Sequence, residues 1–161
     1  MKSETVKALF FWFSIALITA LILFQVSKRS QLALQGIPLQ ASEAVHFKLD
    51  GVELTQFQGK KVLLHFWATW CKACRDEMPL LISLAQRQGD KLEILAIAVD
   101  SSPQSVQEFF GAEQPPFRVL YDLKSQLAEK YGVYQFPESI LINEEGQLET
   151  LYVGPQNWEL F

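Results

Sequence analysis

Apolar and polar residues are distributed unevenly along the chain, and a long uncharged stretch lies near its start. Residues 8–26 read ALFFWFSIALITALILFQV, which is 19 residues without a charge. At about 1.5 Å of rise per residue, a helix of this length measures roughly 28 Å, close to the roughly 30 Å of a bilayer's hydrocarbon core. We therefore expect one N-terminal transmembrane helix over about residues 8–26, within an anchor formed by residues 1–29.

A cleaved secretory signal is the alternative for this segment, with Lys2 and Lys7 as its basic start. We favour an uncleaved anchor because the apolar run exceeds the roughly 7 to 15 residues of a signal core, and no clean small-x-small cleavage site follows it. Lys28 and Arg29 on the other flank balance the two lysines. Charge alone therefore does not decide the orientation of the anchor.

The rest of the chain has the pattern of a single α/β domain over residues 43–161, after a polar tether at 30–42. Alternating or continuous apolar runs predict strands at 45–49, 52–54, 61–67, 92–99, 117–120, 139–143 and 148–153. Apolar spacings of three and four, with capping residues, predict helices at about 71–88, 103–112 and 122–131. Alternation of strands and helices indicates parallel strands joined by helical crossovers.

The net charge of the chain indicates which kinds of partner it can bind. The chain has 14 basic and 18 acidic residues, and residues 1–29 hold four of the basic residues and one acidic residue. The remaining 10 basic and 17 acidic residues give the rest of the chain a net charge of −7. A nucleic-acid-binding domain needs a basic stripe, so we expect no nucleic-acid partner and a soluble domain held beside a membrane.

The chain has two cysteines, Cys71 and Cys74, at the predicted start of a helix. Their spacing is too short to staple a fold and suits reaction with one another. The helix N-terminus favours a thiolate on the first sulfur, so we expect Cys71 to attack disulfides and Cys74, one turn further in, to resolve the mixed disulfide. Lys72 also favours the thiolate. Half of a zinc site is the alternative, but His46 and His65 lack zinc-finger spacing, and we predict no metal and no cofactor.

The stretch GKKVLLHFWATWCKACRDEMPLL, at residues 59–81, resembles the thioredoxin-fold proteins of the TlpA, ResA and DsbE type, which are bacterial membrane-tethered or secreted thiol:disulfide oxidoreductases. The resemblance continues through YGVYQFPESILINEEGQL and YVGP and covers about residues 43–158. It implies a thioredoxin-like α/β fold in which helices flank a central mixed β-sheet. It also implies thiol:disulfide oxidoreductase activity on the periplasmic, extracytoplasmic side of a bacterial cytoplasmic membrane, behind a single-pass anchor.

The resemblance further implies protein disulfide or dithiol substrates and an upstream membrane thiol reductase that restores the dithiol. Proteins with this motif commonly act as reductases in cytochrome c maturation or copper-centre assembly. A disulfide oxidase or isomerase is one alternative within the same chemistry. A Cu(I)-handling thioredoxin-like metallochaperone is another, because thiolates suit soft ions.

Several residues match the family pattern individually. Pro79 falls where the family's active-site helix carries a kinking proline. Pro137 falls where the family has a cis proline facing the cysteines, which exposes the backbone of Phe136 for pairing with a substrate strand. Trp70 corresponds to the tryptophan that lines the substrate-facing surface, whereas Trp67 is expected to pack inward.

Two titratable side chains are candidate proton carriers. Glu77 matches an acidic residue that some of these reductases use, and a buried carboxyl there would exchange a proton with Cys74. The alternative is a solvated helix glutamate. His65 lies six residues before Cys71 in a predicted strand, where it would relay a proton and make the reaction sensitive to pH near neutrality. The alternative, which we favour for His65, is a hydrogen-bonded core histidine.

Three features depart from the family pattern. Lys72 and Ala73 replace the more frequent proline-containing pair between the cysteines. Glu138 stands where a threonine is usual and places a negative charge beside the expected substrate groove. The family continues into a closing helix beyond the last residues of this chain, so we expect Trp158 and Phe161 to cover part of one sheet face instead.

Overall fold

The computed structural model describes residues 12–24, 36–100 and 102–161. The chain divides into two units, residues 1–35 and residues 36–161, and the described part of the first unit is helical. The predicted membrane span at 8–26 extends beyond the described residues at both ends. Within the described ranges, no helix has both the length and the apolar character that a membrane crossing requires.

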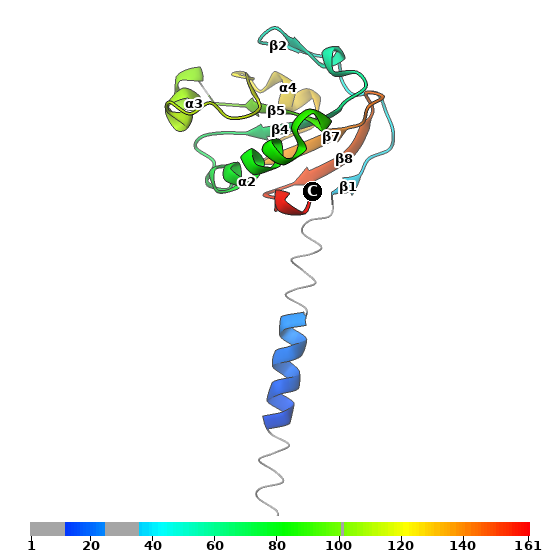
Figure 1. Ribbon diagram of the computed structural model, residues 1–161, viewed down its shortest axis with the longest axis vertical. Coiled ribbons are helices and arrows are strands. Elements are labelled where there is room, and N and C mark those ends of the chain that lie inside the picture. The colour runs from blue at the N-terminus through cyan, green and yellow to red at the C-terminus, as the bar shows by residue number, and fades with distance from the viewer. Residues whose placement is uncertain (1–11, 25–35, 101) are drawn as a thin grey trace, which may run out of the picture. The chain divides into compact units, whose positions relative to one another are not determined.

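A six-stranded mixed sheet forms the centre of the second unit (Figure 1). Its strand order is β1-β8-β7-β4-β5-β6. These strands are β1 (Ile37–Pro38), β4 (Lys61–Trp67), β5 (Leu92–Ala98), β6 (Arg118–Tyr121), β7 (Glu138–Ile142) and β8 (Leu148–Val153). Strands β4, β5 and β6 run parallel, whereas β7 is antiparallel to both β4 and β8. This is the central mixed sheet that the resemblance implies.

Helices cover both faces of this sheet. The helical segments are η1 (Leu54–Phe57), α2 (Lys72–Gln88), η2 (Gly89–Lys91), α3 (Pro103–Phe110), α4 (Gln126–Lys130) and η3 (Trp158–Leu160). Buried side chains of α2, α3 and η3 form the core on one face, and those of α4 and η1 belong to the core on the other. A separate ribbon of β2 (Lys48–Leu49) and β3 (Val52–Glu53) turns at Asp50 and Gly51, as their turn chemistry predicts.

Strand β4 is buried on both faces, as its continuous apolar sequence predicts. Leu63 and Trp67 join the core beneath α2, whereas Leu64 and Phe66 join the core on the opposite face. Because successive side chains of a strand point to opposite faces, His65 points to the α2 face. The strand therefore places a histidine in the same layer as the cysteine-bearing helix.

Most boundaries lie within one or two residues of the sequence-based prediction, and three differences are larger. Residues 37–38, within the predicted tether, pair with β8. Of the strand predicted at 45–49, only residues 48–49 pair as a strand. Helix α4 begins at Gln126, four residues after Asp122, because the Asp122 carboxylate reaches forward and accepts two backbone N–H groups of its first turn, each at 2.9 Å.

The C-terminal segment is fastened to the sheet and to α2. The Trp158 side chain is 1% exposed, and its ring contacts those of Tyr152 and Phe161, with centroids 5.3 Å and 5.8 Å away. Near the C-terminus of α2, Arg87 donates a hydrogen bond to the Trp158 carbonyl at 2.7 Å. As expected from the sequence, Trp158 and Phe161 cover part of the sheet face that carries α2.

Candidate active site

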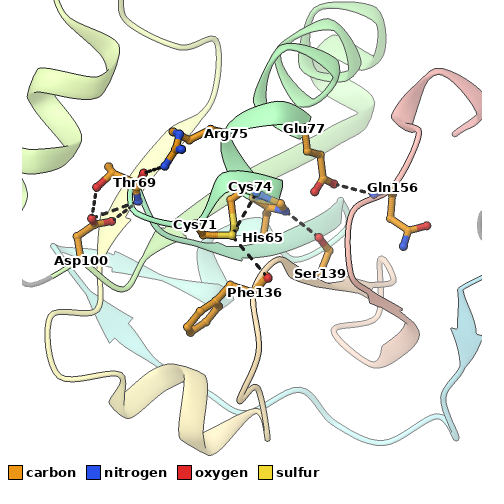
Figure 2. The surroundings of a disulfide bond; sticks show 10 residues. All are labelled: His65, Thr69, Cys71, Cys74, Arg75, Glu77, Asp100, Phe136, Ser139 and Gln156. Carbon is orange, nitrogen blue, oxygen red and sulfur yellow. Dashed lines mark hydrogen bonds between the residues drawn. A yellow bond between two sulfur atoms is a disulfide. The ribbon is translucent and has the colours of Figure 1, made fainter.

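The cysteine pair lies at the N-terminus of α2, directly after the loop that follows β4. Cys71 is the N-cap residue, and its Sγ accepts the backbone N–H of Cys74 at 3.2 Å. The two cysteines form a disulfide, with their Cα atoms 5.3 Å apart (Figure 2). Because the first N–H groups of a helix lack intrahelical partners, this N–H group stabilises negative charge on the Cys71 sulfur after reduction.

The two cysteines differ in accessibility. Cys71 is 8% exposed, whereas Cys74 has no exposed surface. Cys71 is more covered than its position at a helix end predicts, because the loop that precedes β7 lies against it. Of the two sulfurs, only that of Cys71 belongs to a residue that a substrate can contact from outside.

The loop that precedes β7 faces Cys71. Its Phe136–Pro137 peptide bond is cis, as the family pattern predicts. The carbonyl oxygen of Phe136 lies 3.6 Å from Cys71 Sγ (Figure 2). The Phe136 ring meets the ring of Trp70 edge-on at 5.9 Å, and Trp70 is 64% exposed. The structure therefore brings Trp70, Phe136 and Pro137 together beside Cys71.

Two exposed apolar side chains of the same region were not predicted from the sequence. Tyr134, two residues before Phe136, is 79% exposed. Val153 is 42% exposed and pairs in β8 with Glu138, the residue after Pro137. Nearness in sequence to the predicted cis proline is the signal that could have identified Tyr134. Val153 had no such signal, because only the pairing of β8 with β7 brings it there.

Glu77 lies on the buried side of α2, one turn beyond Cys74, and is 3% exposed. Its Oε1 accepts the backbone N–H of Gln156 at 3.3 Å and the indole N–H of Trp158, whereas the buried Oε2 has no hydrogen-bond partner. Burial raises the pKa of Glu77 to about 7, and the two donated hydrogen bonds oppose that rise. Glu77 is therefore not the solvated helix glutamate of the alternative interpretation.

His65 is fully buried on the α2 face of β4. Its Nδ1 lies 2.8 Å from the hydroxyl oxygen of Ser139, and its Nε2 has no partner. Burial lowers the pKa of His65 to about 3, because the charged imidazolium would lose its hydration. The ring therefore stays neutral near neutral pH, as in the favoured interpretation of a hydrogen-bonded core histidine and unlike the alternative of a group that titrates there.

A buried carboxylate that the sequence analysis missed holds the loop before the cysteines. Asp100 is 2% exposed and accepts the Thr69 backbone N–H at 3.0 and 3.2 Å, and also the Thr69 hydroxyl. Arg75 donates a hydrogen bond to the Thr69 carbonyl at 2.7 Å (Figure 2). Thr69 is therefore tied both to Asp100, which follows β5, and to α2. A signal was present, since Asp100 follows a buried strand at the edge where β4 and β5 both end.

The positive charge next to the cysteine pair is weaker than the sequence suggests. Lys72 forms an exposed ion pair with Asp76 at 2.6 Å, so much of its charge is compensated by that carboxylate. Glu138 is 6% exposed beside Pro137. Burial raises the pKa of Glu138, and a hydrogen bond from Gln135 opposes this rise. Lys72 therefore contributes less to stabilising a Cys71 thiolate than its place in the sequence predicts.

Comparison with known families and proteins gives consistent results. The Redoxin family matches residues 36–160 of the chain. The thioredoxin-like protein YneN of Bacillus subtilis (strain 168) is 32% identical over 140 residues, which are 82% of this chain and 79% of that protein. The thiol-disulfide oxidoreductase ResA of Bacillus thuringiensis subsp. konkukian is 36% identical over 123 residues, 74% of this chain and 71% of that protein.

A solved structure extends the similarity to three dimensions. The exposed lipoprotein thioredoxin Etrx1 of Streptococcus pneumoniae superposes with a TM-score of 0.63 at 28% sequence identity. The match covers 71% of this chain and 93% of the pneumococcal one. The fold therefore agrees with the sequence similarity.

Proposed function

The chain belongs to the redoxin family, among the thioredoxin-fold proteins of the TlpA, ResA and DsbE type, and on this premise we propose that Cys71 and Cys74 perform its thiol:disulfide exchange. The chain is a thiol:disulfide oxidoreductase. One observation carries the assignment of roles: the pair sits at a helix N-terminus, and of its two members only Cys71 keeps exposed surface. Cys71 is the attacking residue and Cys74 the resolving residue.

The proposed cycle starts from the dithiol. The Cys71 thiolate attacks one sulfur of a substrate disulfide, forms a mixed disulfide and releases the other substrate sulfur as a thiolate. Cys74 then attacks Cys71 Sγ, which breaks the mixed disulfide and releases the second substrate thiolate. Two electrons pass to the substrate, and the protein ends with the Cys71–Cys74 disulfide of the present structure. An upstream membrane thiol reductase returns it to the dithiol.

Glu77 is the proposed proton acceptor for Cys74. The resolving thiol must lose a proton before it attacks, and Cys74 is shielded from solvent. A carboxyl whose pKa is about 7 can take that proton and return it near neutral pH. His65 also lies on the α2 face of the sheet, but its ring stays neutral near neutral pH. It would therefore relay a proton only by passing it between its two ring nitrogens, without holding the charge.

Trp70, Phe136 and Pro137 are the proposed substrate-binding residues. The Phe136 carbonyl lies beside the attacking sulfur, where an extended substrate segment can pair with the loop backbone. Exposed apolar side chains at Trp70 and Tyr134 would contact residues that flank the substrate cysteine. The apolar character of this surface supports a protein substrate rather than a small charged thiol.

We propose that electrons flow toward the substrate, so that the protein is a reductase. Strong disulfide oxidants owe their potential to a stabilised reduced form. Here Glu77 lies one turn beyond Cys74 on the buried side of α2, His65 is neutral, and the charge of Lys72 is shared with Asp76. These surroundings stabilise a Cys71 thiolate weakly, which favours the disulfide form of the protein and therefore reduction of its partner.

The proposed location is the extracytoplasmic side of a bacterial cytoplasmic membrane, with residues 8–26 as a single-pass anchor. The uncharged length of that segment supports it. The structural relative Etrx1 is an exposed lipoprotein, which is consistent with chemistry outside the cytoplasm. Cytochrome c maturation and copper-centre assembly are the proposed pathways.

Two measurements test the proposal. Equilibration with glutathione buffers should give a potential near thioredoxin's, about −270 mV, whereas a value near about −120 mV would indicate an oxidase. Cys74→Ala in the full chain should accumulate mixed disulfides with substrate proteins, whose identities would assign the pathway. Cys71→Ala is the matched control and should capture none. Alkylation of Cys71 no faster than that of free cysteine would contradict the assigned roles.

A further inference from the structure

We propose that Trp158 is a positioning residue for the exchange reaction, because its indole N–H fixes Oε1 of Glu77 and leaves Oε2 as the atom that carries the proton exchanged with Cys74. This inference rests on the proposed function. It makes the C-terminal segment part of the active site.

The argument begins with the partners of one carboxylate oxygen. Oε1 of Glu77 accepts two hydrogen bonds, from the Trp158 indole and from the backbone of Gln156. Both groups are N–H donors without any acceptor function. A proton on Oε1 would lie among two N–H groups aimed at the same oxygen, with no acceptor to receive it. The proton of the neutral carboxyl therefore resides on Oε2.

Oε2 lies where the resolving cysteine can use it. It is buried and has no hydrogen-bond partner. Glu77 and Cys74 are three residues apart on the buried side of α2, which brings their Cβ atoms to within roughly 5–6 Å. In Figure 2 the carboxylate turns one oxygen toward Gln156 and holds the other on the side of the cysteine pair. The oxygen without a partner is thus the one available to Cys74.

The indole cannot easily leave this position. Trp158 is 1% exposed and is enclosed by the rings of Tyr152 and Phe161. Its carbonyl accepts a hydrogen bond from Arg87 at 2.7 Å, so the backbone at this residue is also tied to α2. Rotation of the Glu77 carboxyl would break the indole contact inside a packed aromatic cluster. The orientation of the carboxyl is therefore set by residues about eighty positions away in sequence.

Neighbouring charges do not explain the orientation. The other charged side chains of α2 are engaged elsewhere, since Lys72 pairs with Asp76 and Arg75 donates to the Thr69 carbonyl. On the neighbouring elements, His65 of β4 and Tyr152 of β8 lie on the α2 face, and Glu159 of η3 is exposed. Glu138 of β7 pairs with Phe66 and so points to the opposite face of the sheet. Arg87 is engaged with the Trp158 carbonyl, and His65 is neutral. A change at Trp158 that keeps its ring should therefore act on Glu77 through the lost hydrogen bond.

The test is Trp158→Phe in the full chain, which keeps an aromatic ring and removes the N–H. The rate of the Cys74 step, followed by release of a peptide thiol from a preformed Cys71 mixed disulfide, is measured against pH. Loss of a donor to the carboxylate favours the protonated carboxyl, so the midpoint should rise by about 0.5 to 1 pH unit. The rate at pH 7 should fall several-fold, because the carboxyl is no longer held with Oε2 toward Cys74.

Two control variants separate positioning from packing. Phe161→Leu disturbs the same aromatic cluster but keeps the indole N–H, and its midpoint should equal that of the unmodified chain. Trp158→Phe added to Glu77→Gln should produce no further shift. Two results would overturn the proposal. One is a Trp158→Phe variant whose rate of the Cys74 step depends on pH as in the unmodified chain. The other is a Trp158→Phe substitution that changes this rate equally with Glu77 present and in the Glu77→Gln variant.

A spectroscopic measurement serves if Trp158→Phe does not fold. The indole ¹⁵N–H signal of Trp158 in the unmodified protein should titrate with the midpoint of Glu77 and should stop titrating in Glu77→Gln. A signal that does not respond to pH would overturn the proposal. This outcome is distinct from failure of the proposed function, which would appear as an unreactive Cys71 whatever the indole signal does.

Discussion

At Glu77, burial and hydrogen bonding act in opposite directions on one carboxyl group. Burial raises the pKa of this side chain from 4.5 to about 7, and donors from Gln156 and Trp158 hold it from rising further. Between pH 4.5 and about 7, Glu77 holds a proton in the native protein and releases it in the unfolded chain. The stabilising effect of that proton is complete below about pH 4.5 and is lost as the pH rises through about 7.

We predict that Glu77→Gln removes this pH dependence. Glutamine keeps an oxygen acceptor for the two N–H donors and carries no charge at any pH. Between pH 4.5 and 8 the free energy of unfolding of the unmodified protein should fall by about 3 kcal/mol relative to the variant. Urea unfolding at several pH values measures the difference. The exposed Glu113→Gln is the control, and parallel pH profiles for Glu77→Gln and the unmodified protein would contradict the prediction.

At the scale of elements, the short loop between β4 and α2 sets where the cysteines begin. Thr69 is the centre of this loop, because its N–H and hydroxyl bind Asp100 at the end of β5 and its carbonyl binds Arg75 in α2. Three elements therefore meet at one residue, two positions before Cys71. Without these contacts, mainly the packing of the buried side chains of α2 would hold its N-terminus in place.

Asp100→Ala should loosen this loop. The substitution leaves the Thr69 N–H without its acceptor, which costs about 1–3 kcal/mol of stability for a buried donor. We expect faster hydrogen exchange at the Thr69 amide and slower attack by Cys71 on a peptide disulfide. The exposed Asp90→Ala serves as control and should behave like the unmodified protein. Equal exchange rates at Thr69 in the two variants would refute a role for Asp100 in holding the loop.

At the scale of the whole molecule, the two units have different physical character. Residues 36–161 form a sheet with two buried cores, whereas the first unit contains the uncharged segment at 8–26. The acidic character of the rest of the chain suits a domain in water. Under the proposed function, residues 36–161 carry the catalysis and residues 8–26 the membrane attachment.

We predict that the full chain stays in the membrane fraction after an alkaline carbonate wash, because about 19 uncharged residues can span the hydrocarbon core. Residues 36–161 expressed alone should appear in the soluble fraction and keep disulfide exchange. Cell fractionation with detection of a C-terminal tag measures both. Recovery of a shortened chain in the soluble fraction would indicate that the N-terminal segment is a cleaved signal instead.

The sequence by itself determined those features that depend on neighbouring residues. The apolar runs at β4 and β5, the helix stop at Gly89 and the turn at Asp50 follow from local spacing and backbone preference, and all appear in the structure. The cysteine pair and its place at a helix start also needed no more than a short motif. Local signals suffice there because periodicity and turn chemistry act over a few residues.

Only the tertiary structure decided the environment of the side chains that control protons and hold the site. Glu77 meets Trp158 across 81 positions, His65 meets Ser139 across 74, and Thr69 meets Asp100 across 31. A pKa depends on desolvation and on the partners of the group, and both arise when distant segments pack together. The same glutamate or histidine on an open surface would keep its ordinary behaviour, which is why sequence patterns left both residues with two interpretations.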